Sequence, residues 1–288
     1  MIDLLPQIEA WQTSGEHIGI ATVVRVVGSA PRPVGSRMIV SSSGQMAGSV
    51  SGGCVETTVY EELMDVLAGG PARMLHYGIT EDMIWDVGLA CGGTIDVFVQ
   101  RLDPAFVAAF KHHREQGVPV ALATTISGGG NIGETSLITA KGVVLGNVDD
   151  AISSAAHGML SEGESVGAVK AIEPATELFI ECFLPPPVLL LVGGVHVAIP
   201  LAHFAKDLGF YVIVIDPRAK FANRERFPDA DEVLLEWPDE ALGHLDVDDR
   251  TYVVLLTHDP KIDEPTLAAA LKTEACYIGA IGSRKTHA

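Results

Sequence analysis

Two cysteines of the sequence each stand beside a pair of glycines. The first motif is GSVSGGCVE at residues 48–56, which contains Cys54, and the second is GLACGG at residues 88–93, which contains Cys91. Apolar residues recur three and four positions apart between residues 55 and 67, so a helix is expected to start just after Cys54. Backbone N–H groups are expected to point outward at that start, where the helix dipole favours an anion and the thiolate form of a cysteine.

The glycines of both motifs allow a ligand to approach the backbone closely. Gly52 and Gly53 belong to the first motif, and Gly92 and Gly93 belong to the second. A residue without a side chain leaves room for such an approach. A single free cysteine is more often a small buried apolar residue than a reactive group. Because two glycine-flanked cysteines occur here, a functional thiol site and a structural role are both kept as interpretations.

Two arginines flank the Gly- and Pro-rich loop at residues 28–35 (GSAPRPVG). Arg32 lies inside this loop and Arg37 lies just after it. A guanidinium group forks onto carboxylate or phosphate, so the two arginines are a candidate clamp for an anion. The alternative is an ordinary solvated surface charge. The chain as a whole repels anions, so an anionic ligand requires a local site of this kind.

The composition excludes several classes of function. Lys and Arg total 19 against 37 Asp and Glu, for a net charge of −18, which argues against binding to nucleic acid or to an anionic membrane surface. The four cysteines form no C-x-x-C pair, and the N-terminus lacks the pattern of a signal peptide. The most apolar run begins at Val188 but contains glycine and proline, so no membrane span is expected. We expect a cytoplasmic protein with reduced thiols.

An internal repeat organises the first part of the chain. A β-rich run at residues 18–27 is matched by one at 120–124, where Thr124 corresponds to Thr22 with an offset of 124 − 22 = 102. Residues 141–148 resemble residues 43–50, and a helical pattern follows this segment in each copy. Residues 177–180 resemble residues 96–99. The pattern predicts an α+β domain with an internal duplication over residues 1–184. The second copy has no cysteine, so any chemistry is expected in the first.

The sequence predicts a second domain after the stiff linker Pro185-Pro186-Pro187. Five apolar runs alternate with helical stretches, beginning at residues 188, 211, 231, 252 and 276. This alternation is typical of an α/β fold, a Rossmann-like doubly wound parallel sheet, over residues 188–288.

The first strand–helix turn of this domain is a candidate nucleotide site. Gly193, Gly194 and His196 stand at the turn, and Asp216 follows at 216 − 193 = 23 residues, near the spacing of a ribose-binding acid. The match to G-x-G-x-x-G/A is incomplete, because Val195 occupies the middle glycine. A Rossmann-like scaffold without a nucleotide is the competing interpretation.

The chain resembles the XdhC/CoxI family of xanthine dehydrogenase accessory proteins. Residues 28–32, 48–56 and 88–93 are similar to its N-terminal blocks, and residues 193–198, 221–228, 257–259 and 277–285 to its C-terminal Rossmann blocks. The resemblance covers almost the whole chain in order. There are two departures: Val195 stands where the family commonly has glycine, and the chain ends at Ala288 where relatives continue. Two interpretations of the second departure are kept: the second domain is a shortened form, or its final segment is missing from the sequence given.

The resemblance implies a maturation factor for molybdenum hydroxylases. Such a protein binds molybdenum cofactor (molybdopterin), supports its sulfuration by a cysteine desulfurase, and delivers it to an apo-enzyme of the xanthine or carbon monoxide dehydrogenase type. Cys54 and Cys91 would then be soft ligands for the metal, and Arg32 with the helix start would suit the phosphate of the pterin. The Rossmann domain would hold NAD(P) or a nucleotide form of the cofactor, and a homodimer is expected.

Two other functions remain open on the sequence. One is an NAD(P)-dependent oxidoreductase with an active-site cysteine, in contrast to a cofactor chaperone without turnover of its own. It predicts nucleotide binding and an electron acceptor. The other is an interaction scaffold, which predicts no small-molecule ligand.

Overall fold

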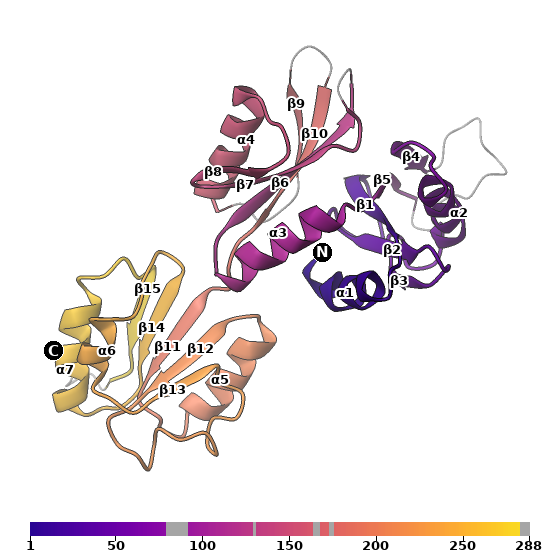
Figure 1. Ribbon diagram of the computed structural model, residues 1–288. Helices are drawn as coiled ribbons and strands as arrows, with labels where there is room; N and C mark the ends of the chain where they lie inside the picture. The colour runs from indigo at the N-terminus through magenta and orange to yellow at the C-terminus, as the bar shows by residue number, and fades with distance from the viewer. Residues whose placement is uncertain (79–91, 129–130, 164–167, 173–175, 283–288) are drawn as a thin grey trace. The chain divides into compact units, whose positions relative to one another are not determined.

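The structure of the protein is a computed structural model that describes residues 1–78, 92–128, 131–163, 168–172 and 176–282. The chain divides into two compact units, Met1–Pro185 and Pro186–Ala288. The first unit contains two antiparallel sheets and the second contains one parallel sheet (Figure 1). The predicted α/β fold class is confirmed.

The first unit is built from two successive sets of elements. The first set consists of η1 (Ile2–Leu4), α1 (Leu5–Thr13), β1 (Ile18–Val27), β2 (Arg37–Ser41), β3 (Met46–Gly48), α2 (Glu56–Leu67), β4 (Arg73–Tyr77) and β5 (Thr94–Arg101). The second set consists of α3 (Pro104–Glu115), β6 (Val120–Ser127), β7 (Thr135–Thr139), β8 (Gly142–Leu145), α4 (Asp150–Ser161), β9 (Ala168–Ile172) and β10 (Thr176–Phe183). Sheet A has the order β3-β2-β1-β5-β4 and sheet B has the order β8-β7-β6-β10-β9. Each strand of sheet A therefore has a counterpart at the same position in the strand order of sheet B, as the internal repeat predicts.

The correspondence between the repeats extends to single residues. Thr22 pairs with Arg37 and Phe98 in sheet A, and Thr124 pairs with Thr135 and Phe179 in sheet B. In both sheets the register of the central pair then shifts, between residues 23 and 25 in β1 and between residues 125 and 127 in β6. The two central strands are thus equivalent at the offset of 102 residues, including their β-bulges.

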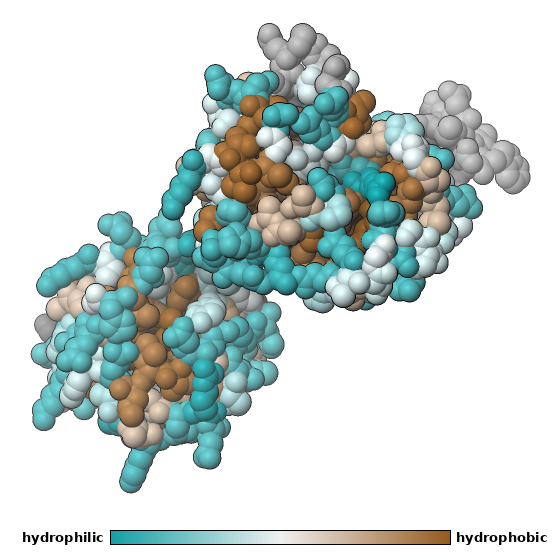
Figure 2. All heavy atoms as spheres, viewed as in Figure 1, coloured by the Kyte–Doolittle hydropathy of each residue, from teal (hydrophilic) through white to brown (hydrophobic). Residues whose placement is uncertain are grey.

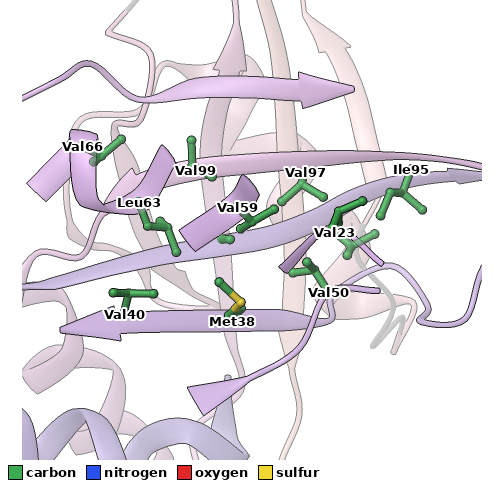
Figure 3. Packing of buried hydrophobic residues seen from close by; sticks show 12 residues of the cluster. Val23, Met38, Val40, Val50, Val59, Leu63, Val66, Ile95, Val97 and Val99 are labelled. Carbon is green, nitrogen blue, oxygen red and sulfur yellow. The ribbon is translucent and has the colours of Figure 1, made fainter. Parts of the chain in front are cut away.

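The core of each repeat lies between its sheet and its second helix. In the first repeat, Val59 and Leu63 of α2 pack on Val23, Met38 and other apolar residues of sheet A (Figure 3). Val50, from the loop before α2, belongs to the same cluster and fastens that loop to the core. In the second repeat, α4 packs on sheet B in the same way. Further clusters join α1, α3 and both sheets, so β1 is buried over most of its length.

The second unit is a parallel sheet with helices on both faces. Its elements are β11 (Val188–Val192), α5 (Ala198–Asp207), β12 (Tyr211–Ile215), β13 (Glu232–Leu234), α6 (Pro238–Leu242), β14 (Thr251–Leu255), α7 (Pro260–Ala270) and β15 (Tyr277–Ala280). The strand order is β13-β12-β11-β14-β15, with every pair parallel. One apolar cluster joins α5 to the sheet and another joins α6 and α7 to it. This is the arrangement of a Rossmann-type unit, with the order reversing between β11 and β14.

The surfaces of both units are largely polar in the view of Figure 2, with hydrophobic areas between the hydrophilic residues. Among the residues that the structure describes, no helix has the length and apolar character needed to cross a membrane.

Candidate functional site

Three Gly-rich segments meet at one end of the paired strands β1 and β5 of sheet A. The segments are residues 28–32, 49–55 and 92–93, and we call them the three-loop cluster. The first segment follows β1 and the last precedes β5, and these strands pair at Val27 and Thr94. A Cβ atom placed on Gly93 would lie 2.2 Å from the carbonyl oxygen of Ser29, and one placed on Gly52 would lie 3.9 Å from Pro31. The cluster therefore brings together motifs that the sequence holds more than 60 residues apart.

Glu56 organises the middle segment of this cluster. Its carboxylate accepts hydrogen bonds from the backbone N–H of Ser51 (2.9 Å), Gly52 (3.0 Å) and Gly53 (2.8 Å). It also accepts from the hydroxyl groups of Ser49 (2.6 Å) and Ser51 (2.5 Å). The expectation that these loop N–H groups point outward toward a bound anion is therefore wrong, because a carboxylate of the chain itself already occupies them.

The pKa of Glu56 reflects this arrangement. Burial alone would raise the pKa of this carboxyl group. The hydrogen bonds from Ser49 and Ser51 outweigh that effect and lower the pKa to about 2. Glu56 is thus ionised at neutral pH and holds the loop closed around itself.

Cys54 is half-buried and lies two residues before the first residue of α2. Cys54 also packs against the apolar cluster that lies under α2. Val55, the next residue, is the N-cap of this helix. Cys91, the expected second ligand of the metal, lies outside the described residues, so the expectation that both thiols bind one metal centre stays a prediction. Within the described part of the chain, no group of three or more His, Cys, Asp or Glu residues is placed to hold a metal ion.

The two arginines of the predicted clamp have different surroundings. Arg32 is exposed, and it makes no ion pair or hydrogen bond within the residues that the structure describes. Together with Pro33 and Gly48 it lines a groove of about 790 Å³. Arg37 is buried and pairs with Glu181 of the second repeat, and it also donates to the carbonyl oxygen of Gly35 (3.0 Å). Arg37 is therefore not part of a clamp, and only Arg32 is available to an external anion.

The turn between β11 and α5 packs closely against two other segments of the second unit. A Cβ atom on Gly193 would lie 2.4 Å from the side chain of Thr257, and one on Gly194 would lie 2.5 Å from the carbonyl oxygen of Phe221. These contacts explain both glycines without a ligand. His196 is exposed at the turn before α5, and Val195 is half-buried beside it.

Asp216 at the end of β12 is fully buried and already engaged. Its carboxylate accepts from the N–H of Gly194 (2.9 Å), from the N–H of Arg218 (2.9 Å) and from two guanidinium nitrogens of Arg218 (2.9 and 2.8 Å). Burial would raise the pKa of Asp216, but these hydrogen bonds outweigh it and hold the pKa below its ordinary value. The carboxylate braces the turn and offers no free oxygen to a ribose.

Sequence reasoning missed the role of Glu56. The signal was present, because two serines and two glycines stand three to seven residues before an acid in the first turn of a helix. This pattern is a variant of the capping box, in which a glutamate reaches back to the N–H groups before its own helix.

The architecture and the three-loop cluster define a class of protein with a duplicated antiparallel first unit and a Rossmann-type second unit. Residues 11–78 match the family model described as the XdhC and CoxI family, and residues 189–288 match the model described as the XdhC Rossmann domain. The first match lies in the first unit and the second match lies in the second unit, so the chain contains an XdhC and CoxI family domain followed by an XdhC Rossmann domain. The family resemblance seen in the sequence is confirmed.

The alignments with two named relatives cover nearly the whole chain. A protein of Bacillus subtilis (strain 168), named as a probable subunit of xanthine dehydrogenase, is 27% identical over 281 residues, which cover 96% of this chain and 82% of that protein. The molybdenum cofactor insertion chaperone PaoD of Escherichia coli (strain K12) is 28% identical over 276 residues, which cover 95% of this chain and 70% of that protein. A crystal structure described as a xanthine dehydrogenase from Bacillus halodurans is 26% identical, with a TM-score of 0.73, and the match covers 98% of this chain and 83% of that one.

Proposed function

We propose that the chain is an accessory protein that binds molybdenum cofactor and delivers it to a molybdenum hydroxylase. The observation that carries this proposal is the three-loop cluster in a chain of the XdhC and CoxI family. Cys54 stands in that cluster, half-buried. The match to a relative named a molybdenum cofactor insertion chaperone supports the same role.

The residues of the cluster fit the cofactor through side chains. A thiolate is a suitable ligand for a soft metal centre, and Cys54 is within reach of solvent. An exposed guanidinium without an internal partner suits a phosphate, and Arg32 is such a group within the described residues. When bound, the cofactor supplies the molybdenum centre and the anionic phosphate to which these groups would be directed. The loop N–H groups contribute indirectly, because through Glu56 they hold Cys54 in a fixed place.

The finer parts of this function are proposals of the same kind. Sulfuration of the bound cofactor by a cysteine desulfurase, transfer to an apo-enzyme of the xanthine or carbon monoxide dehydrogenase type, and a homodimeric state all come from the family resemblance. Gly92 and Gly93 lie in the cluster, so the second motif would contribute Cys91 to the same ligand set.

Anaerobic purification followed by measurement of molybdenum and pterin per chain tests the proposal. The unaltered chain should retain cofactor, and Cys54→Ala should lose most of it while melting at nearly the same temperature, because one small residue replaces another. The matched control is Cys276→Ala, which removes an exposed cysteine of the second unit and should retain the cofactor. Undiminished retention in a double Cys54→Ala, Cys91→Ala variant would move the site away from the thiols.

A further inference from the structure

One side of the parallel sheet in the second unit is only half covered by helices. Helix α5 packs on β11 and β12, whereas α6 and α7 pack on the opposite side of the sheet (Figure 1). Within the described residues of the second unit, no other helix lies over β14 and β15 on the side of α5. An all-parallel sheet is normally covered on both sides, because its strands are apolar on both.

The burial of the strands shows the same asymmetry. In β11 and β12 every residue after the first is buried. In β14 buried and half-buried residues alternate, since Val253 and Leu255 pack in one cluster with α6 and α7. Tyr252 and Val254 point to the side of α5 and are only half-buried. Tyr277 of β15 pairs with Tyr252 and is 53% exposed, so the α5 side of both strands is within reach of solvent.

Helix α5 borders these strands with a stripe of apolar side chains. Residues 197, 201, 204 and 208 recur at a spacing of four and three, which places them on one side of the helix. Phe204 is 62% exposed and Leu208 is 76% exposed. Leu201 belongs to the same cluster as Tyr252, so the stripe faces the uncovered strands. We call the stripe and the strand residues beside it the open face, which consists of Val197, Leu201, Phe204, Leu208, Tyr252, Val254 and Tyr277.

The open face has the composition of a protein interface. All its residues are apolar or aromatic and none is charged. The cores of protein interfaces are depleted in charged residues and enriched in Phe and Tyr, and a contiguous exposed patch of this kind marks an interaction site. The chain has a net charge of −18, so two copies of it repel each other least where they meet at an uncharged surface.

The open face lacks a helix with an apolar stripe, and the chain itself carries such a helix in α5. When the α5 helices of two copies lie antiparallel across a two-fold axis, each helix fills the empty place beside the other. Leu201 of one copy then lies opposite Phe204 of its partner, and Val197 lies opposite Leu208. Such a contact uses the same surface on both copies, so it closes as a dimer.

We propose that the open face binds a second copy of this chain, with α5 packed against α5 of the partner copy and over the partner's strands β14 and β15. This proposal assigns an interface to the homodimeric state proposed above and rests on that state. It does not depend on cofactor binding, because no residue of the open face belongs to the three-loop cluster.

Sedimentation equilibrium of the full chain, purified without cofactor, tests the dimer. The mass should rise from 30.4 kDa toward twice that value as the concentration increases. The series extends to about 100 μM, where a dimer with a micromolar Kd is well populated. A chain that stays monomeric over this range would overturn the proposal, including a monomer that binds only other proteins.

Two variants test the two halves of the open face. Leu208→Glu changes the helix and Tyr277→Glu changes the strands, and both positions are exposed in the single chain, so circular dichroism should stay unaltered. Each variant should raise the Kd of the dimer about thirtyfold or more, because a carboxylate replaces a contact in an apolar interface. Leu271→Glu is the matched control, since it changes a leucine of similar exposure (68%) at the end of α7 and should leave the Kd unaltered. An unaltered Kd in either open-face variant, or equal weakening by Leu271→Glu, would contradict the proposal.

A cross-link decides the question should an open-face variant not fold. Phe204→Cys in a Cys276→Ala background places a thiol near the proposed two-fold axis and removes an exposed native thiol. A short bismaleimide should join two such chains, and Leu271→Cys in the same background should remain unjoined. Absence of the Phe204→Cys cross-link would overturn the proposal. Molybdenum and pterin per chain are measured separately, so failure of the open face and failure of the thiol site are recognisable independently.

Discussion

Arg37 of the first repeat donates to Glu181 of the second, across the interface of the two sheets. The register relates this contact to a second one, because Thr135 is the counterpart of Arg37 and Gln100 is the counterpart of Glu181. Gln100 donates to Thr135, also from one repeat to the other. The duplication has thus kept the geometry of a crossing pair, but only one copy is an ion pair. The charged copy joins the repeats by an ion pair, whereas in the neutral copy the buried Gln100 Oε1 has no hydrogen-bond partner among the described residues.

Breaking the ion pair should destabilise the first unit strongly. Arg37→Met leaves the carboxylate of Glu181 buried without its partner, which costs about 3–5 kcal/mol in comparable cases. The double variant Arg37→Met, Glu181→Leu should recover much of that loss, because two apolar residues replace the pair. Urea unfolding of the unaltered chain, Arg37→Met, Glu181→Leu and the double variant measures this. A double variant as unstable as the sum of the single variants would show that the contact is not coupled.

Replacing Glu56 should loosen the cysteine loop. Glu56→Gln removes the charge that accepts hydrogen bonds from Ser49, Ser51 and Gly53, and we expect a loss of about 1–3 kcal/mol at pH 7. The rate of Cys54 alkylation should rise, because the loop that positions this thiol opens more often. Glu61→Gln, at an exposed position of α2, is the control and should change neither quantity.

The same residue predicts a dependence of stability on pH. The folded pKa of Glu56 is lowered from 4.5 to about 2, so its contribution is complete above pH 4.5 and is lost as the pH falls toward 2. The difference in unfolding free energy between the unaltered chain and Glu56→Gln should therefore shrink between these two pH values. A difference that stays constant down to pH 2 would disprove the assignment of the carboxylate as the organiser of the loop.

The sequence predicted the folds of both units because their signals are local or periodic. The repeat was visible as an offset of 102 residues between Thr22 and Thr124, and the structure places these residues at equivalent positions of two equivalent sheets. The strands of the second unit were visible as apolar runs, since a parallel strand with helices on both faces needs apolar residues on both sides.

The candidate site could be predicted only in part, since spacing does not reveal which partner a polar group takes. Arg32 and Arg37 look alike in the sequence, but the partner of Arg37 is 144 residues away and only the folded chain brings it near. Likewise, nothing in the spacing of Asp216 shows that Arg218, two residues later, folds back on its carboxylate. The N–H groups before α2 were recognised as an anion site, and the anion proved to be the side chain of Glu56.

The contacts of Asp216 also predict the affinity of the second unit for the dinucleotides NAD and NADP. A free acid at this place distinguishes NAD from NADP by binding the ribose 2′-OH. Here both carboxylate oxygens are occupied by Gly194 and Arg218, and Val195 restricts approach to the backbone. We therefore expect weak binding of both dinucleotides, with affinities that differ by less than about fivefold, since one hydrogen bond is worth about 1 kcal/mol. Val195→Gly should strengthen both equally, because it opens the turn to the pyrophosphate and leaves Asp216 engaged. Titration of each dinucleotide into the two proteins measures this, and tight, NAD-selective binding by the unaltered chain would show that the carboxylate is released on binding.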